Sequence, residues 1–169
     1  HLSFGPPTVS GFVAGHCSIR PHSDRNITTT FTYTTLVCLP AVLRARGWHT
    51  AYFTGSDPDW DNQTIWLRRW YDEESFYRDA DERDRVVFRR AASRIIELGQ
   101  QGTPFFATVI SISNHYPFRS REPGLDLTDS AAPGEAIRNT LHYTDDVLRE
   151  FVRSLAREPW FAHTLLVVV

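Results

Sequence analysis

Thr8 is the first residue of this sequence whose type and place are suited to chemistry. It follows Pro6 and Pro7 and opens a stretch of small and apolar residues. Its hydroxyl can cap the helix that this stretch predicts, because a threonine oxygen accepts a hydrogen bond from a free backbone N–H. It can also act as a nucleophile, because hydroxyls form covalent intermediates when neighbouring groups activate them. The residues alone leave both interpretations open.

His115 is the second candidate, and it follows the apolar run PFFATVISIS at residues 104–113. Such continuous runs are typical of strands buried on both faces of a parallel sheet. Ligands of these sheets gather beyond the carboxyl ends of the strands. The same rule points to the segment TGSDPDWDN at residues 54–62, after a shorter strand at 49–55. We therefore favour a functional role for His115 over that of a loop histidine bonded to backbone.

The elements around these residues alternate between strand and helix. Hydrophobic periodicity and stop signals predict helices over 12–19, 36–47, 62–70, 79–102 and 135–159 and strands over 49–55, 104–113 and 164–169, with residues 20–35 forming a surface loop. The helix over 79–102 would bury Val87, Ala91, Ile95 and Leu98, and its acidic first turn suits the helix dipole. The helix over 135–159 would bury Ile137, Leu141, Leu148, Phe151 and Leu155. This order predicts an α/β fold with three layers and a mostly parallel central sheet.

Composition limits the functional classes. The chain has 169 residues and a net charge of −2, so it is long enough for one domain and carries no mark of a nucleic-acid binder. It contains no Met, so we expect these residues to be the central piece of a longer protein. The run LLVVV at the end is too short to cross a bilayer. Any membrane segment would lie outside residues 1–169.

Cys17 and Cys38 have three possible uses. Paired, they would staple a long polar connection, and unpaired they would be small buried residues. Together with His16 and His22 they could also form a zinc site, but the histidine spacing fits no usual pattern of zinc ligands.

Five segments in this order resemble the sulfatase and alkaline phosphatase superfamily, within it the lipoteichoic acid synthase-like branch of phosphoglycerol transferases. The segments are PTVSGFVAGHCSI, VCLPAVLRARGWHTAYFTG, WDN, PFFATVISISNHYPF and HYTDDVLREFVRSLAREPWFAHTLLVVV. Each segment alone is a weak signal, whereas the series covers nearly the whole chain. The resemblance implies one catalytic domain over residues 1–169, truncated at both ends.

The resemblance also implies roles for residues. Thr8 matches the nucleophile that attacks a phosphate or sulfate ester, and a divalent metal, Mn, Mg, Ca or Zn, would hold the ester oxygens. Thr8 would be a metal ligand, with the other ligands outside this chain. His115 matches a histidine that faces the substrate, and Trp60 and Asn62 match residues that line the pocket. Where relatives carry Arg, Asn62 brings no charge.

The function implied is a metal-dependent phospho- or sulfo-ester transferase or hydrolase outside the cytoplasm. Its substrate would be a phosphate or sulfate ester, for which lipid- and glycan-linked esters are candidates, and the full-length protein would be membrane-anchored through other segments. Cys17 and Cys38 match a cysteine pair of exported members, which implies a disulfide. The alternative is a non-catalytic relative that binds or senses in the cell envelope.

Overall fold

The computed structural model describes residues 8–20, 22, 25, 27–30, 32–33, 35–80, 83–118, 126–128 and 132–169. In these parts the helices are α1 (Thr8–Cys17), α2 (Ile27–Thr30), α3 (Leu39–Arg44), α4 (Gln63–Trp70), α5 (Asp84–Gln100) and α6 (Pro133–Leu155). The strands are β1 (His49–Thr54), β2 (Glu73–Phe76) and β3 (Phe105–Ile110). Short 3₁₀ segments are η1 (Trp60–Asn62), η2 (Arg78–Ala80) and η3 (Pro159–His163).

The three strands form one parallel sheet in the order β2-β1-β3. In the pairing of β1 with β3, His49 lies opposite Phe105 and Thr54 opposite Ile110. Parallel strands need long crossover connections, and these contain α4 between β1 and β2 and α5 between β2 and β3. Because all three strands run the same way, their carboxyl ends meet at one edge of the sheet.

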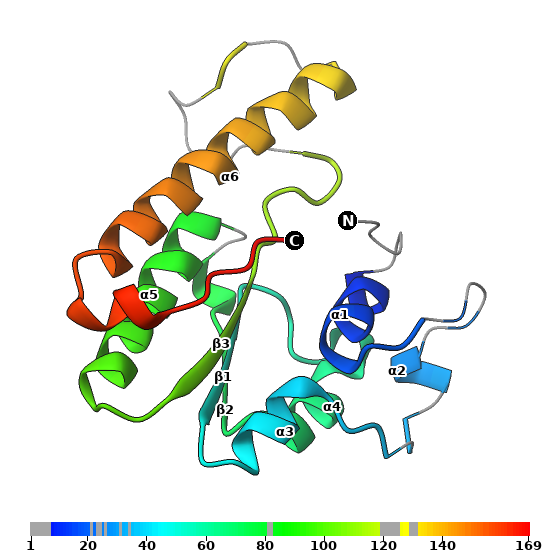
Figure 1. The fold of residues 1–169 in the computed structure, drawn as a ribbon. Coiled ribbons are helices and arrows are strands. Elements are labelled where there is room, and N and C mark those ends of the chain that lie inside the picture. The colour runs from blue at the N-terminus through cyan, green and yellow to red at the C-terminus, as the bar shows by residue number, and fades with distance from the viewer. Residues whose placement is uncertain are drawn as a thin grey trace.

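Helices cover both faces of the sheet. Figure 1 shows α5 and α6 on one side and α1, α3 and α4 on the other. Each face of the sheet has its own hydrophobic core, because successive side chains of β1 point to opposite faces. Ala51 and Phe53 pack with α5 and α6, whereas Tyr52 between them packs with α1 and α4. The predicted three-layer α/β architecture is confirmed.

Helix α5 follows its predicted pattern. Its buried side chains include Val87, Ala91, Ile95 and Leu98. The helix begins at Asp84 and not at residue 79, because residues 78–80 form the separate turn η2.

Helix α6 buries a different stripe from the predicted one. Its buried residues are Asn139, Thr140, Tyr143, Val147, Phe151 and Leu155. Phe151 and Leu155 agree with the prediction, and Leu148 is half-buried. Ile137 and Leu141 are exposed, so the prediction was wrong for them. The polar Asn139 and Thr140 take their place because both find hydrogen-bond partners, Asn139 with the backbone of Leu127 and Thr128.

Two strand assignments also differ from the sequence prediction. Residues 164–169 are irregular and pair with no strand in the described part of the chain, and Leu165 and Val169 are 87% and 94% exposed. An apolar run supplies strand propensity, but a strand needs a partner for its backbone. β2 was not predicted because its sequence, EESF, is charged. Arg94 binds Glu73 at 2.8 Å and Arg68 binds Glu74 at 3.0 Å, which accommodates both carboxylates.

The predictions for residues 20–47 need smaller corrections. Helix α3 begins at Leu39 and not at residue 36, because Cys38 before it has an extended backbone. The chain turns after Arg44, and Gly47 takes a left-handed φ of 84°. The polar segment before α3 contains the helix α2, where Thr28 is buried.

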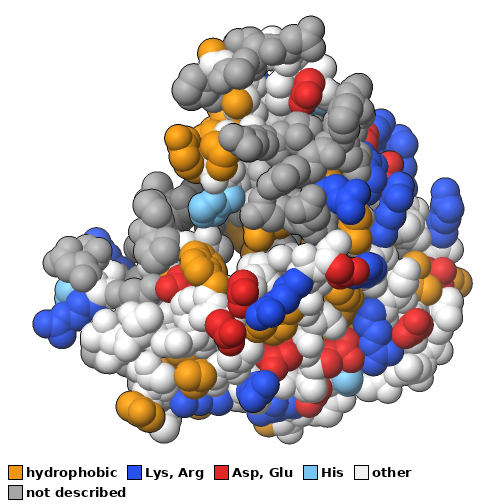
Figure 2. Space-filling model, turned by 180° about the vertical axis from the view of Figure 1, so that it is seen from behind, with side chains coloured by type: hydrophobic (Ala, Val, Ile, Leu, Met, Phe, Trp, Pro, Cys, Tyr) orange, Lys and Arg blue, Asp and Glu red, His pale blue; other side chains and the backbone are white. Residues whose placement is uncertain are grey.

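Acidic and basic side chains alternate over much of the surface. Figure 2 shows them interspersed on the face seen from behind. None of the helices in the described part is long and apolar enough to span a membrane.

Candidate functional site

Thr8 is the first residue of α1, and its side chain is exposed. The opposite side of this helix is buried, with Val13 fully inaccessible to solvent. Phe12 packs edge-on against Tyr52 of the central strand, with the ring centroids 5.8 Å apart. The apolar side chains therefore hold α1 on the sheet and leave the hydroxyl of Thr8 in solvent.

The direction of α1 brings its start to the carboxyl edge of the sheet. His16, near the end of α1, lies 3.1 Å from the hydroxyl oxygen of Thr108 in the middle of β3. Figure 1 shows α1 running opposite to β3. Thr8 precedes His16 by eight residues, which is about 12 Å along a helix. Two strand residues, from Thr108 to Ile110, span only about 7 Å. The start of α1 therefore reaches past the end of β3.

His115 lies in the turn that follows β3, and its side chain is exposed. Its Nδ1 lies 3.0 Å from the carbonyl oxygen of Tyr116. Because a carbonyl only accepts hydrogen bonds, Nδ1 carries a proton, and Nε2 is the ring atom that can face a ligand. His115 and the start of α1 are thus at the same edge of the sheet, on segments more than a hundred residues apart.

Trp60 and Asn62 lie in η1, beyond the carboxyl end of β1. Trp60 is 44% exposed. The amide nitrogen of Asn62 donates to the carbonyl oxygen of Thr28 at 3.4 Å, and Trp66 Nε1 donates to the same oxygen at 3.3 Å. Asn62 therefore ties η1 to α2. One of the two N–H donors of its side-chain amide is therefore already engaged in a hydrogen bond within the protein.

A partly buried polar network beneath α1 was not predicted. His16 Nδ1 lies 2.9 Å from the carbonyl oxygen of Phe12, Nε2 lies 3.1 Å from Thr108 Oγ1, and Tyr71 Oη lies 2.8 Å from the same Oγ1. Nδ1 must donate to the carbonyl, so a neutral ring accepts at Nε2 from Thr108, whose oxygen in turn accepts from Tyr71. Burial lowers the pKa of His16, and the bond to Phe12 opposes it in part. The sequence analysis treated His16 as an ordinary histidine.

A second network, around Asp84, was also missed. Asp84 is fully buried at the start of α5 and accepts hydrogen bonds from the backbone N–H groups of Ile112 and Ser113. The predicted helix began at residue 79, so its acidic first turn did not include Asp84, and no local pattern singled this residue out.

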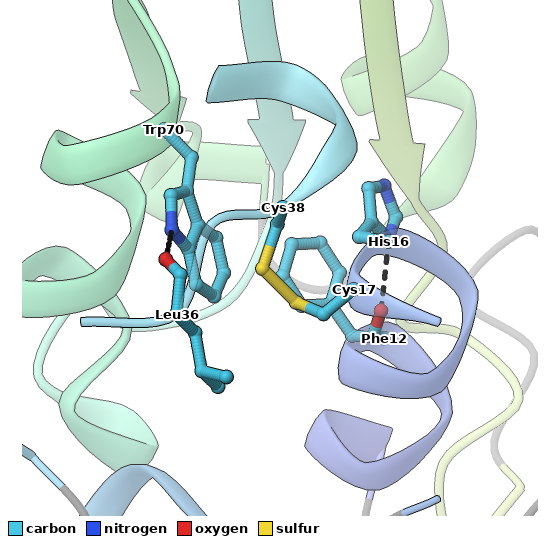
Figure 3. The surroundings of a disulfide bond; sticks show 6 residues. All are labelled: Phe12, His16, Cys17, Leu36, Cys38 and Trp70. Carbon is cyan, nitrogen blue, oxygen red and sulfur yellow. Dashed lines mark hydrogen bonds between the residues drawn. A yellow bond between two sulfur atoms is a disulfide. The ribbon is translucent and has the colours of Figure 1, made fainter. Parts of the chain in front are cut away.

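The structure pairs Cys17 with Cys38 in a disulfide, which confirms that expectation. The bridge joins the end of α1 to the residue before α3, with Trp70 nearby (Figure 3). Because both thiols are consumed, the zinc site with His16 and His22 is ruled out.

No group of three or more His, Cys, Asp or Glu side chains in the described ranges could hold a metal ion. Thr8 offers one hydroxyl, which does not make a metal site by itself. These residues therefore do not fit a complete metal centre.

A family model for sulfatases matches residues 5–169. The chain belongs to the sulfatase family. Lipoteichoic acid synthase 2 of Bacillus subtilis is 22% identical over 165 residues, covering 89% of this chain and 25% of the relative. Lipoteichoic acid synthase 1 of the same organism is 25% identical over 145 residues, covering 77% and 22%. This sulfatase-family chain thus spans about a quarter of the length of these relatives.

Solved structures agree with the fold. The lipoteichoic acid synthase LtaP from Listeria monocytogenes superposes with a TM-score of 0.76 at 22% identity, over 89% of this chain and 40% of that one. A protein of the alkaline phosphatase superfamily from Vibrio parahaemolyticus also gives 0.76, at 18% identity, over 89% and 39%. The sulfatase-family chain thus has an alkaline phosphatase-like fold, as the sequence resemblance implied.

Proposed function

We propose that the complete protein is a transferase or hydrolase of phosphate or sulfate esters, in which Thr8 is the nucleophile. Membership of the sulfatase family supports this class of enzyme. The observation that carries the assignment of Thr8 is its exposed hydroxyl on the first residue of α1. Free N–H groups at a helix start attract anions, so a phosphate or sulfate group would be held beside this oxygen.

In the proposed reaction the oxygen of Thr8 forms a bond to phosphorus or sulfur while the bond to the ester oxygen breaks. The hydroxyl proton of Thr8 passes to a base or to water, and the leaving alkoxide takes a proton from Nε2 of protonated His115. Water or an acceptor hydroxyl then attacks the phosphorus or sulfur atom carried by Thr8 and gives its proton to Nε2 of His115. The bond from Thr8 to the transferred group breaks, and the oxygen of Thr8 takes back a proton from the base or water that received it. Nδ1 of His115 bonds to the Tyr116 carbonyl, which orients the ring for this task.

Trp60 and Asn62 would line the pocket for the remainder of the substrate. The exposed indole of Trp60 offers an apolar wall, and the second amide donor of Asn62 can bind an ester oxygen. Asn62 brings no positive charge, so we expect weaker selection for polyanionic groups than an Arg would give.

Enzymes of this superfamily use a divalent metal, and Mn, Mg, Ca or Zn would suit the oxygen ligands. When bound, such an ion would stabilise negative charge on the transferred group. Thr8 would supply one ligand, and the other ligands would come from outside the described residues.

The disulfide supports a location outside the cytoplasm, because such bonds persist in oxidising compartments. The Bacillus subtilis relatives are named lipoteichoic acid synthases, which supports a lipid- or glycan-linked ester as the substrate here. A membrane anchor, which the sequence resemblance implied, would lie in segments other than these.

The test compares Thr8→Ala, Thr8→Ser and Ser10→Ala in the complete protein, with whatever sequence flanks these residues. We expect Thr8→Ala to lower kcat for ester turnover by at least about a thousandfold, because it removes the attacking atom. Thr8→Ser keeps a hydroxyl and should retain part of the activity. Ser10→Ala is the matched control, since Ser10 is a buried hydroxyl on the same helix.

Full activity of Thr8→Ala would contradict the nucleophile assignment. Absence of ester turnover in the wild-type protein supplied with each of the four metals would contradict the enzymatic proposal and favour a binding or sensing module.

A further inference from the structure

We propose that Asp84 is a positioning residue, whose buried carboxylate fixes the turn after β3 and thereby the place of the His115 ring. This inference rests on the proposed function, because it concerns the group that we assign as proton donor. Asp84 itself would touch neither substrate nor metal.

The carboxylate of Asp84 is surrounded by backbone donors of the turn. Its Oδ1 accepts from the N–H of Ile112 at 2.7 Å, and Oδ1 and Oδ2 accept from the N–H of Ser113 at 3.3 and 3.2 Å. In return the N–H of Asp84 donates to the hydroxyl oxygen of Ser113 at 3.2 Å. Asp84 and Ser113 are both buried, so water does not compete for these bonds.

We call the bonds between Asp84 and residues 112–113 the clamp, and further hydrogen bonds connect it to His115. The N–H of His115 donates to the carbonyl of Ile112 at 3.1 Å, and the N–H of Phe118 donates to the carbonyl of His115 at 2.8 Å. Ile112 therefore links the two residues, because its N–H donates to Asp84 and its carbonyl accepts from His115. A shift of the 112–113 backbone would move the imidazole directly.

The other side of the clamp is anchored in the helix layer. The N–H of Arg85, next to Asp84, donates to the hydroxyl of Tyr143 on α6 at 3.0 Å. The Arg85 guanidinium lies 2.8 Å from Asp146, also on α6. The packing of α5 against α6 therefore fixes Asp84, and Asp84 in turn fixes the turn after β3.

The burial of Asp84 distinguishes this role from a dipole contact. Burial raises the pKa of the carboxyl, and the hydrogen bonds from Ile112 and Ser113 oppose that rise. An exposed aspartate in the first turn would interact with the helix dipole without the cost of burying a charge. The turn needs an acceptor for the two N–H groups of Ile112 and Ser113, and the carboxylate supplies it.

The test uses two esters that differ only in whether the leaving group needs a proton from an acid. The complete protein is assayed on a matched p-nitrophenyl and alkyl ester of the class on which it is active. An alkoxide needs a proton to leave and p-nitrophenolate does not, so loss of the acid slows the alkyl ester more. Three variants are compared: His115→Gln as reference, Asp84→Asn, and Asp79→Asn as control. Asp79 is an exposed aspartate that pairs with Arg90 of α5, so Asp79→Asn makes the same chemical change outside the turn.

We expect Asp84→Asn to lower kcat for the alkyl ester at least about tenfold more than for the p-nitrophenyl ester, as His115→Gln does. Asp79→Asn should lower both rates equally or not at all. If His115→Gln separates the two esters and Asp84→Asn does not, the inference about Asp84 is wrong and the proposed function stands. If His115→Gln fails to separate them, the assignment of His115 as the proton donor and the inference about Asp84 both fail, while the assignment of Thr8 as the nucleophile is tested separately.

A milder variant covers the case in which Asp84→Asn does not fold. Ser113→Ala keeps the carboxylate and its bonds from the backbone N–H groups, and removes the hydroxyl that accepts from the N–H of Asp84 and hydrogen-bonds its carboxyl. It should show the same preference for the p-nitrophenyl ester to a smaller degree, and equal loss on both esters would overturn the inference.

Discussion

His16 joins α1 to β3 as a neutral imidazole, and its hydrogen bonds depend on that state. The ring accepts at Nε2 from Thr108 and donates at Nδ1 to Phe12. A proton on Nε2 would remove the acceptor and place a charge in a partly buried site. Burial accordingly lowers the pKa of His16 from its ordinary 6.5.

We predict that His16 makes the fold less stable in acid. With its pKa lower in the folded state, the unfolded chain binds more protons between the two pKa values, so the free energy of unfolding falls as pH decreases below about 6.5. His16→Gln should show a shallower decrease over that range. The matched control is His142→Gln, at an exposed histidine of α6. Denaturant unfolding at several pH values measures the effect, and equal slopes for wild type and His16→Gln would contradict it.

At the residue scale, the sequence indicated groups by their place along the chain but not by their distant partners. His115 could be singled out because it follows an apolar strand, and its exposure agrees with that prediction. Asp84 and His16 could not, since their partners Ile112 and Thr108 lie 28 and 92 residues away. Asn62 was expected to line a pocket, and its bond to Thr28 was invisible for the same reason.

At the element scale, the disulfide fixes the end of α1 against the start of α3. Cys17 is the last residue of α1 and Cys38 directly precedes α3. Their Cα atoms are 4.2 Å apart, across a sequence separation of 21. The intervening segment is polar, and its ends would separate freely in the unfolded chain without the bridge.

We predict that removing this disulfide lowers the free energy of unfolding by about 2–4 kcal/mol, because the bridge restricts the unfolded chain. The double variant Cys17→Ala/Cys38→Ala, followed by denaturant unfolding, measures the loss. Wild type under reducing conditions is the control and should lose a similar amount, whereas the double variant should not respond to reductant. Equal stability of oxidised and reduced wild type would contradict the prediction.

Elements with strong periodicity could be predicted and those that depend on pairing could not. The stripe of α5 repeats every three or four residues, so Val87, Ala91, Ile95 and Leu98 were identified. β2 carries two glutamates that are neutralised by arginines from helices α4 and α5, which no local pattern reveals. Residues 164–169 show the converse, because an apolar run does not create a partner strand.

At the scale of the whole molecule, a parallel sheet brings separate segments to one edge. The alternation of strands and helices was enough to predict three layers and this edge. The face that each helix covers followed only from the structure, where α1 and α4 pack on Tyr52 and α5 and α6 pack on Phe53. The start of α1 and the turn that carries His115 consequently lie at the same edge.

The most direct test of the central claim is the mass of the peptide that contains Thr8. The complete protein is mixed with its ester substrate, quenched within the first turnovers, digested and analysed by tandem mass spectrometry. We predict that this peptide gains the mass of the transferred group at Thr8, and that the gain is absent in Thr8→Ala and retained in Ser10→Ala. Turnover with the group attached to another residue, or the same modification in Thr8→Ala, would contradict the account.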